Sequence, residues 1–177
     1  TKAFHDETFG AFRNYKKVTD GEDIKSFYII DLKSKYDCFP FGFGGVIIRA
    51  EVFKKQSVDP ALGLEAERDF MLRLMAKSMK TCFLPYATLT AYEYEEHDNI
   101  FYRGLYMREW YFESITDFWM PFLQEMKVTY GSIPVFIQYN FMYSVMARFN
   151  GNMDNKNKHV IEEGHGEEYL ELIGQAL

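Results

Sequence analysis

Four short stretches in the first hundred residues have apolar patterns that predict strands. The run 26–32 is rich in β-branched and aromatic residues and predicts a strand, as does the shorter run 46–49. The glycine-rich stretch 39–45 between them predicts a loop. Two further strands are expected at 81–85 and 88–94, the second because apolar and hydroxyl side chains alternate there.

Helical spacing governs much of the remaining sequence. A helix is expected over 59–79, because Asp59 can cap its start and is followed by a proline suited to the first turn. The segment 101–126 predicts a long helix that Pro121 kinks or breaks. A second helix is expected over 135–149, and its dense apolar content predicts burial on most sides.

The ends of the chain are more polar. Residues 1–26 predict a short helix or irregular structure, 152–168 a loop, and 169–177 a last short helix. Together these elements predict an α/β chain in which a few strands pack with helices over 1–98. A mainly helical segment is expected to follow over 99–177 and to pack on the first part.

One acidic residue falls on the apolar side of the helix expected over 59–79. At about 100° per residue, Glu67 lies within an apolar stripe, whereas Asp69 and Arg73 point the other way. The apolar members of the stripe are Leu64, Met71, Leu74 and Met75. A carboxylate directed at a core is costly unless it is paired, bound or catalytic. Glu67 is therefore the first candidate for a functional group, and the alternative is an exposed helix start that keeps it in water.

Composition narrows the class of protein. The chain has 177 residues, of which 47% are hydrophobic, so it can bury a sizeable core. A net charge of −6 argues against a general nucleic-acid binder, which needs a basic surface. Cys38 and Cys82 have no metal-site spacing, and a reducing compartment is the simpler interpretation. No apolar run is long enough to predict a transmembrane helix.

Histidines and glycines offer weaker signals. His97 follows a predicted strand, where functional groups are common, so it is a minor candidate. His165 lies in an acidic stretch that could hold a cation, although a solvated loop is the preferred interpretation. The glycines at 42–45 lack the spacing of a dinucleotide-binding fingerprint and the lysine of a P-loop.

The order of two stretches resembles the second half of bacterial family-2 glycosyltransferases with the GT-A fold. The first stretch is the glycine-rich run 41–45 followed by 46–53, and the second is 67–73. Within the first, residues 45–53 match a glycine, two apolar residues, an arginine and a later phenylalanine, and 67–73 match an acidic motif that ends in arginine. In that family the first Asp of the motif is taken as the base that deprotonates the acceptor hydroxyl. Counting back from Arg73, Glu67 occupies the base position, and Ala66 stands where the family usually has Glu.

This resemblance implies a partial GT-A-like fold, with 1–98 as the acceptor-side part of the catalytic domain. It implies an inverting glycosyltransferase that moves a sugar from a nucleotide-sugar donor to a saccharide or glycoconjugate acceptor, as in cell-surface polysaccharide synthesis. Glu67 would be the catalytic base, with Asp69 beside it. Arg73 and His97 would contact substrate, and the loop containing Gly44 and Gly45 would line the acceptor cleft.

The resemblance also implies parts that these residues do not supply. The nucleotide-binding half would precede residue 1, and it would bring the divalent metal, Mg²⁺ or Mn²⁺, so the fragment alone is not expected to transfer sugar. The chain also opens on Thr1 rather than Met, as a piece of a longer protein would. The expected location is the cytoplasm or the inner face of the membrane, without nucleic-acid partners. The alternative is a non-catalytic protein- or membrane-interaction domain with an aromatic-rich helical face.

Overall fold

A computed structural model describes most of the chain. The described residues are 2–4, 27–40, 42–84, 91–93, 104, 106–153, 160–161 and 164–176. His97 and the first residues of the helix expected over 101–126 lie outside them.

The described strands form two antiparallel pairs. β2 (Tyr28–Asp31) pairs with β3 (Lys80–Phe83), which confirms the strands predicted at 26–32 and 81–85. β1 (Lys2–Phe4) pairs with β4 (Ala91–Glu93), so the prediction of helix or irregular structure is wrong at the N-terminus. β4 falls within the strand predicted at 88–94.

The strand predicted at 46–49 does not form. The Val46 amide donates to Phe43 O in a turn, and Arg49 already caps the next helix, α2 (Ala50–Phe53). The apolar residues between this turn and this helix pair with no described strand. Their spacing is that of a strand, but a strand needs a neighbour to bond its amides and carbonyls.

Helices make up most of the described structure. After α2 they are the 3₁₀ helix η1 (Pro60–Glu65), α3 (Ala66–Ser78), α5 (Arg108–Tyr111), the π-helix η3 (Ser114–Trp119), α6 (Met120–Tyr130), α7 (Val135–Met153) and α8 (Gly166–Ala176). α7 confirms the helix predicted at 135–149, and α8 contains most of the one predicted at 169–177. The predicted loop 152–168 is wrong at both ends, because α7 runs to Met153 and α8 begins at Gly166.

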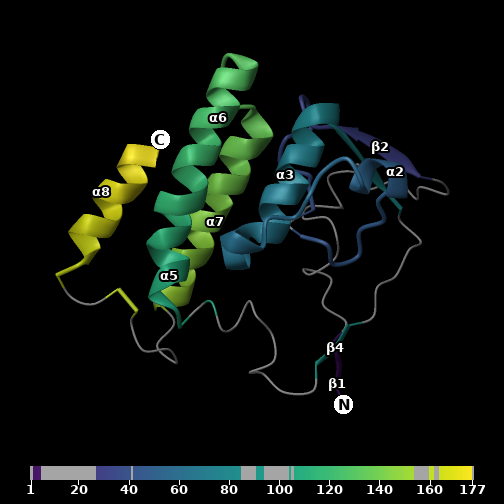
Figure 1. Cartoon of the computed structure of the whole chain (residues 1–177). Helices are drawn as coiled ribbons and strands as arrows, with labels where there is room; N and C mark the ends of the chain where they lie inside the picture. Colours follow the sequence, from purple (N-terminus) through teal and green to yellow (C-terminus); the bar gives the residue numbers. More distant parts are fainter. Residues whose placement is uncertain are drawn as a thin grey trace.

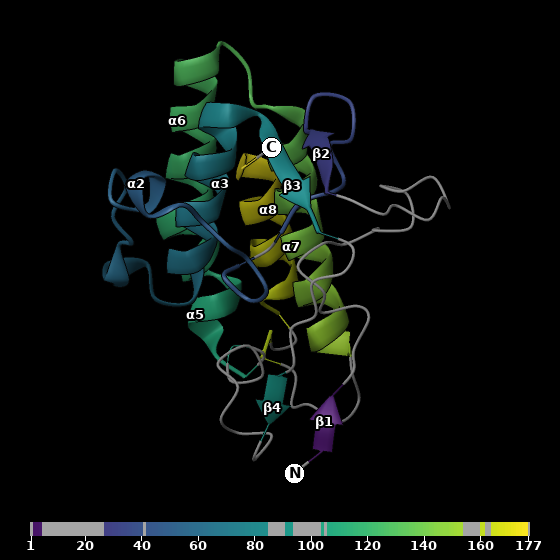
Figure 2. The same cartoon turned by 90° about the vertical axis from the view of Figure 1, so that its right-hand side faces the viewer.

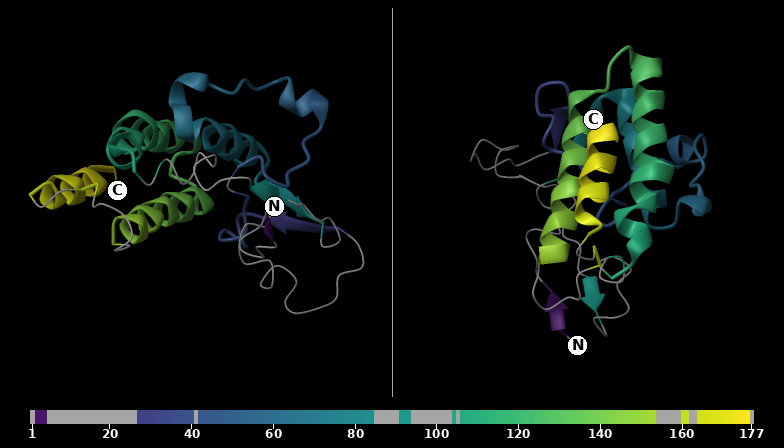
Figure 3. Two further views of the ribbon diagram at one scale, coloured as in Figure 1. Left: turned by 90° about the horizontal axis from the view of Figure 1, so that it is seen from below. Right: turned by 90° about the vertical axis from the view of Figure 1, so that its left-hand side faces the viewer.

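The helices lie in a row. α6 and α7 run side by side, α8 covers them on one side and α3 lies on the other, with the β2–β3 pair beyond α3 (Figure 1). The view along the helices keeps this order, and α8 stands in front of α6 and α7 when seen from its own side (Figure 3). The β1–β4 pair lies at one end of the molecule, below the helices (Figure 2).

The start of α3 has a two-part construction. The side chain of Asp59 accepts a hydrogen bond of 3.0 Å from the Ala61 amide, as its predicted capping role requires. The chain then makes 3₁₀ turns and kinks at Gly63, where φ is +52°, before the α-helix begins at Ala66. With a ψ of −116°, this conformation is close to the mirror image of the β region, which glycine adopts readily because it has no Cβ, so Gly63 permits the change of helical phase.

The helix predicted over 101–126 is not a single α-helix. α5 passes into the π-turns of η3, and Pro121 stands in the first turn of α6. A proline there lacks an amide that the first turn leaves unbonded in any case, so it begins α6 rather than breaking it. α6 ends at Gly131, whose φ of +77° is the left-handed conformation of a common helix C-cap.

Both halves of the sequence contribute to one apolar core. Ile30, Phe70 and Leu72 from the first half are buried in the same cluster as Trp119 and Phe141. The Trp119 and Phe141 rings lie 5.1 Å apart and join η3 to α7. Cys38 is buried, Cys82 is exposed, and no disulfide joins them.

The architecture agrees with the predicted class at a coarse level. The described residues are mostly helical with small antiparallel strand pairs, which is broadly an α/β arrangement. No helix in the described ranges has the length and apolar character needed to cross a bilayer.

Candidate functional site

Glu67 meets the glycine loop. Its side chain projects from the first turn of α3, and Oε2 accepts a hydrogen bond of 3.0 Å from the Phe43 amide. Gly42 lies against the same oxygen, and a Cβ placed on it would stand only 2.8 Å from Oε2. The two stretches that carry the family resemblance therefore touch, although they are 24 residues apart in sequence.

Glu67 does not face the core as its helical position predicts. The side chain is exposed, and the exposed strip of α3 runs through Glu67 and Ser78, with Leu74 half-buried between them. The most buried face carries Asp69, Leu72 and their neighbours instead. The core-facing interpretation is wrong and the alternative, an exposed helix start that keeps Glu67 in water, is confirmed. Because α3 bears apolar residues on nearly all sides, its periodicity does not identify one inward face.

Asp69 and Arg73 form a pair on another face of α3. Asp69 is only 5% exposed, and the Arg73 Nε donates to its Oδ1 at 2.7 Å. The Arg73 Nη1 also bonds Glu125 of α6 at 2.5 Å. The structure thus brings Asp69 and Arg73 together, as the shared motif suggests, but not with Glu67, since two positions along a helix point about 200° apart.

The electrostatics of this pair follow from its burial. Loss of water raises the pKa of Asp69, and the neighbouring carboxylates of Glu125 and Asp59 raise it further. The guanidinium of Arg73 opposes this effect without cancelling it. Its hydrogen bond to Glu125, and the charge of Asp69, raise the pKa of Arg73, which therefore stays charged.

A cleft opens over the Asp69–Arg73 pair, between α3, η3, the start of α6 and the connection before η1. Its volume is about 460 Å³, within the range of roughly 300–1,000 Å³ typical of small-molecule sites. The residues that line it are Lys55, Gln56, Ser57, Asp59, Leu62, Asp69, Arg73, Asp117, Phe118, Pro121, Phe122 and Glu125. Below, this hollow is called the α3–α6 cleft.

A buried ionic network is the main polar feature that the sequence did not predict. Glu65 is 3% exposed and accepts hydrogen bonds from Ser114 Oγ at 2.5 Å and from Arg148 Nη2 at 2.8 Å. Its other oxygen pairs with Arg68 at 2.9 Å. Arg148, which is 0% exposed, also bonds Ser144 and the carbonyl of Trp110. The network ties the start of α3 to η3 and α7.

The charges in this network favour ionised groups despite their burial. Burial alone would raise the pKa of Glu65, but Arg68, Arg148 and the Ser114 hydroxyl outweigh it and hold the pKa below its usual value. Burial lowers the pKa of Arg148, and Glu65 partly restores it. One signal for this network was in the sequence, because Arg148 is the single charged residue in α7, whose other residues are mostly apolar.

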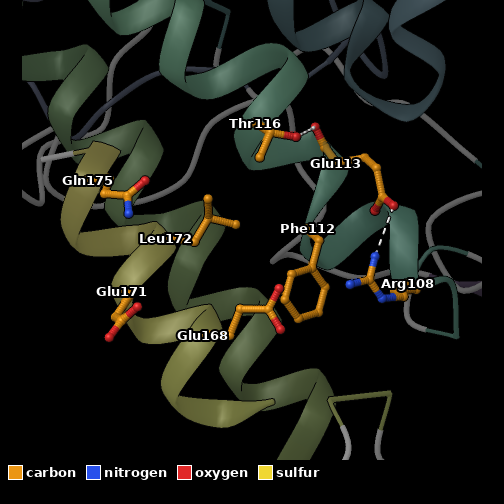
Figure 4. Close-up of a pocket in the computed structure, with 8 residues that line it drawn as sticks. All are labelled: Arg108, Phe112, Glu113, Thr116, Glu168, Glu171, Leu172 and Gln175. Atoms are coloured by element: carbon orange, nitrogen blue, oxygen red, sulfur yellow. Dashed lines mark hydrogen bonds and ion pairs between the residues drawn. The ribbon is translucent and has the colours of Figure 1, made fainter.

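A second hollow, of about 290 Å³, lies between α8 and the segment that joins α5 to η3. Arg108 pairs with Glu113 at 3.1 Å there and stacks over the Phe112 ring at 4.2 Å, while Glu168 of α8 points toward the same ring (Figure 4). None of the residues predicted to act in substrate binding or catalysis lines it.

The other residues predicted to bind substrate do not all lie at one place in the described structure. Gly44 and Gly45 belong to the exposed part of the loop that contacts Glu67, and nothing lies within 4 Å of a Cβ placed on Gly44. His97 lies outside the described residues. Across the part of the chain that the structure describes, no group of three or more His, Cys, Asp or Glu side chains could hold a metal ion. The divalent ion implied by the resemblance thus has no fitting site there.

Comparison with protein-family models, with curated proteins and with solved structures gave no match.

Proposed function

We propose that this chain is the acceptor-side part of an inverting glycosyltransferase, with Glu67 as the base that activates the acceptor hydroxyl. The observation that carries the proposal is the hydrogen bond of 3.0 Å between Glu67 Oε2 and the Phe43 amide. It joins the two stretches on which the resemblance rests, and it supports a common site made by the loop and the first turn of α3.

The geometry of Glu67 suits a general base. The Phe43 amide holds Oε2 in place, and Oε1 has no protein partner among the described residues. The side chain is exposed, so an acceptor can reach Oε1 without rearrangement of the core.

In the proposed reaction, the Glu67 carboxylate accepts one proton in each turnover. The acceptor hydroxyl gives its proton to Glu67, and the resulting oxygen nucleophile attacks the anomeric carbon of the donor sugar. The bond between that carbon and the nucleoside diphosphate breaks, and the configuration at the carbon inverts. The nucleotide-binding half and its divalent metal would lie before residue 1, as the resemblance implies, and no step here is assigned to them.

Other predicted residues would support the site indirectly. Asp69 and Arg73, paired at 2.7 Å, brace α3 against α6 through Glu125. They do not touch Glu67, so their proposed role is to position the helix that carries it. Gly44 and Gly45 would leave room for an acceptor beside the loop.

The first experiment measures nucleoside diphosphate release by the full-length gene product from a panel of nucleotide-sugars, with simple saccharides as acceptors. Glu67→Gln keeps the size of the side chain but cannot accept the proton. Its turnover should fall about 100- to 10,000-fold. The matched control is Glu51→Gln, since Glu51 is another exposed glutamate in a first helical turn, that of α2. It should retain wild-type turnover.

Two outcomes would count against the proposal. Near-wild-type turnover by Glu67→Gln would remove Glu67 from the chemistry while leaving the enzyme class intact. Absence of release from every donor by the wild-type protein would argue against the transferase itself.

The second outcome would favour a non-catalytic interaction module, which one observation supports. Apolar side chains spaced along α7 are 42–53% exposed: Val135, Tyr139, Met142 and Met146. They recur at helical spacing and form an exposed row on one side of α7, as a helix that docks on a partner would. The exposed position of Glu67 is also what this alternative expects.

A further inference from the structure

The α3–α6 cleft lies away from Glu67 and has its own chemistry. Its polar lining supplies carboxylates, a lysine, an arginine, an amide and a hydroxyl, while its apolar wall comes from Leu62, Phe118, Pro121 and Phe122. Eight of the twelve lining residues are polar or charged, so a ligand in this cleft would be recognised mainly through hydrogen bonds, with the apolar wall as one contact face.

Much of the hydrogen-bonding capacity in the cleft is unused. One oxygen of Asp69 binds Arg73 at 2.7 Å, one of Asp117 accepts from Thr116 at 2.7 Å, and one of Asp59 caps η1 at 3.0 Å. The second oxygen of each has no protein partner among the described residues. The Ser57 hydroxyl and the Lys55 ammonium are likewise unpaired within that part of the chain. The free groups include both acceptors and donors, with acceptors in excess.

Charge restricts what the cleft can hold. Four carboxylates, those of Asp59, Asp69, Asp117 and Glu125, face two cations, Lys55 and Arg73, which leaves a net charge of −2 in the lining. Burial raises the pKa of Asp69, and Glu125 and Asp59 raise it further, so these carboxylates repel one another. An additional anion would strengthen this repulsion, which disfavours phosphates, nucleotides and acidic sugars. Hydroxyl donors would relieve it.

We propose that the α3–α6 cleft binds a neutral saccharide ring, as a subsite for a remote unit of the acceptor. The choice of a saccharide rests on the proposed function, whereas the preference for a neutral ring rests on the cleft. The ring hydroxyls donate to the free oxygens of Asp59, Asp69 and Asp117, and Lys55 and Ser57 donate to ring oxygens. The Phe118 and Phe122 side chains contribute the apolar wall against the C–H face of the sugar.

The test is a titration of the ¹⁵N-labelled 177-residue chain, followed by NMR. The probes are methyl glucoside, glucuronic acid and glucose 1-phosphate, which share one ring and differ in charge. Methyl glucoside should shift the amides that line the cleft, including Asp117 and Glu125. The two anionic probes should bind at least about ten-fold more weakly.

Two variants locate the binding. Asp117→Ala removes an exposed acceptor whose side chain, within the described ranges, bonds only its neighbour Thr116, so the fold should survive. Loss of one hydrogen bond should weaken methyl glucoside binding about five-fold. Asp117→Asn keeps one acceptor oxygen and should restore part of the affinity. Glu109→Ala, an exposed carboxylate of α5 outside the cleft, is the matched control.

Several outcomes would overturn the inference. They are absence of cleft-specific shifts with methyl glucoside, equal or tighter binding of an anionic probe, and unchanged affinity in Asp117→Ala. Each leaves the proposed transferase standing, because nucleotide release by the full-length protein is measured separately. Conversely, cleft binding with no nucleotide release would preserve the subsite and reject the transferase.

Discussion

At the scale of single residues, Gly42 is the position on which the geometry of Glu67 depends. Its lack of a side chain allows the loop to approach the carboxylate so closely that the Phe43 amide reaches Oε2. A methyl group there would stand 2.8 Å from that oxygen. The obstructed atom is the end of a flexible side chain, so the carboxylate can move aside while the backbone stays in place.

Gly42→Ala should therefore displace Glu67 without unfolding the protein. We expect the free energy of unfolding to change by no more than about 0.5 kcal/mol. The Phe43 amide should lose its hydrogen bond to Oε2, with an upfield shift of its proton in the NMR spectrum and faster hydrogen exchange. Gly44→Ala, where the added methyl group meets nothing within 4 Å, should leave that amide unchanged. An unchanged Phe43 amide in Gly42→Ala would contradict the contact.

The same residues show what the sequence could predict about the site. The motif at 67–73 that carries the family resemblance predicted a common site for Glu67, Asp69 and Arg73. The structure does pair Asp69 with Arg73. The sequence did not identify Glu65, two positions before Glu67, as the buried carboxylate. The kink at Gly63 and the apolar surroundings of α3 conceal the helical phase, and the partner Arg148 is 83 residues away. Local periodicity contains no information about so distant a partner.

At the scale of elements, the helices are recognisable from their own residues, and in α6 a proline and a glycine mark the two ends. α3, α7 and α8 could be predicted because apolar spacing persists through each of them. The π-turns of η3 could not, since their residues have ordinary helical spacing and the extra residue is accommodated by packing. The prediction of a strand at 46–49 failed for a similar reason, because strand pairing depends on a neighbour that is distant in the sequence.

The glycines at and within helices give a paired prediction. Gly131 adopts a φ of +77° at the end of α6, so Gly131→Ala should destabilise the protein by about 1 kcal/mol. Gly174 lies inside α8 with nothing within 4 Å of its added methyl group, and Gly174→Ala should stabilise it by about 0.5–1 kcal/mol. Urea unfolding of both variants checks the opposite signs. A similar change in both would contradict the assigned helix end.

At the scale of the whole molecule, the ionic network around Glu65 and Arg148 joins segments that the sequence separates. Removing one member leaves a charge in the core without its partner. Glu65→Gln should therefore lower the free energy of unfolding at neutral pH by about 3–5 kcal/mol. Glu109→Gln, an exposed carboxylate outside the network, should have little effect.

The pH dependence distinguishes this network from the α3–α6 cleft. The pKa of Glu65 is lowered in the folded state, so its stabilising effect is present above the unfolded value of 4.5 and is lost as the pH falls through the folded pKa. The difference in free energy of unfolding between Glu65→Gln and the wild-type protein should thus become smaller at acidic pH. Burial raises the pKa of Asp69 above its unfolded value of 3.8. The contribution of Asp69 to folding stability is therefore largest below pH 3.8 and is lost as the pH rises through the folded pKa.

The stability of Asp69→Asn should accordingly change in the opposite direction. Its free energy of unfolding should rise relative to that of the wild-type protein as the pH rises through the folded pKa of Asp69. Urea unfolding at a series of pH values from about 3 to about 7 measures both differences. If both variants changed with pH in the same direction, the assigned direction of the pKa shift would be wrong for either Glu65 or Asp69.

The π-turns of η3 also set a requirement on chain length. A π-turn takes up one residue more than an α-turn, and here it brings Ser114 to Glu65 while Trp119 packs on Phe141. Loss of a single codon between 114 and 119 would let α5 run into α6 as one regular helix. Everything beyond would then turn by about 100° relative to α5. Between these helices the gene is constrained in the number of its codons as well as in their identity.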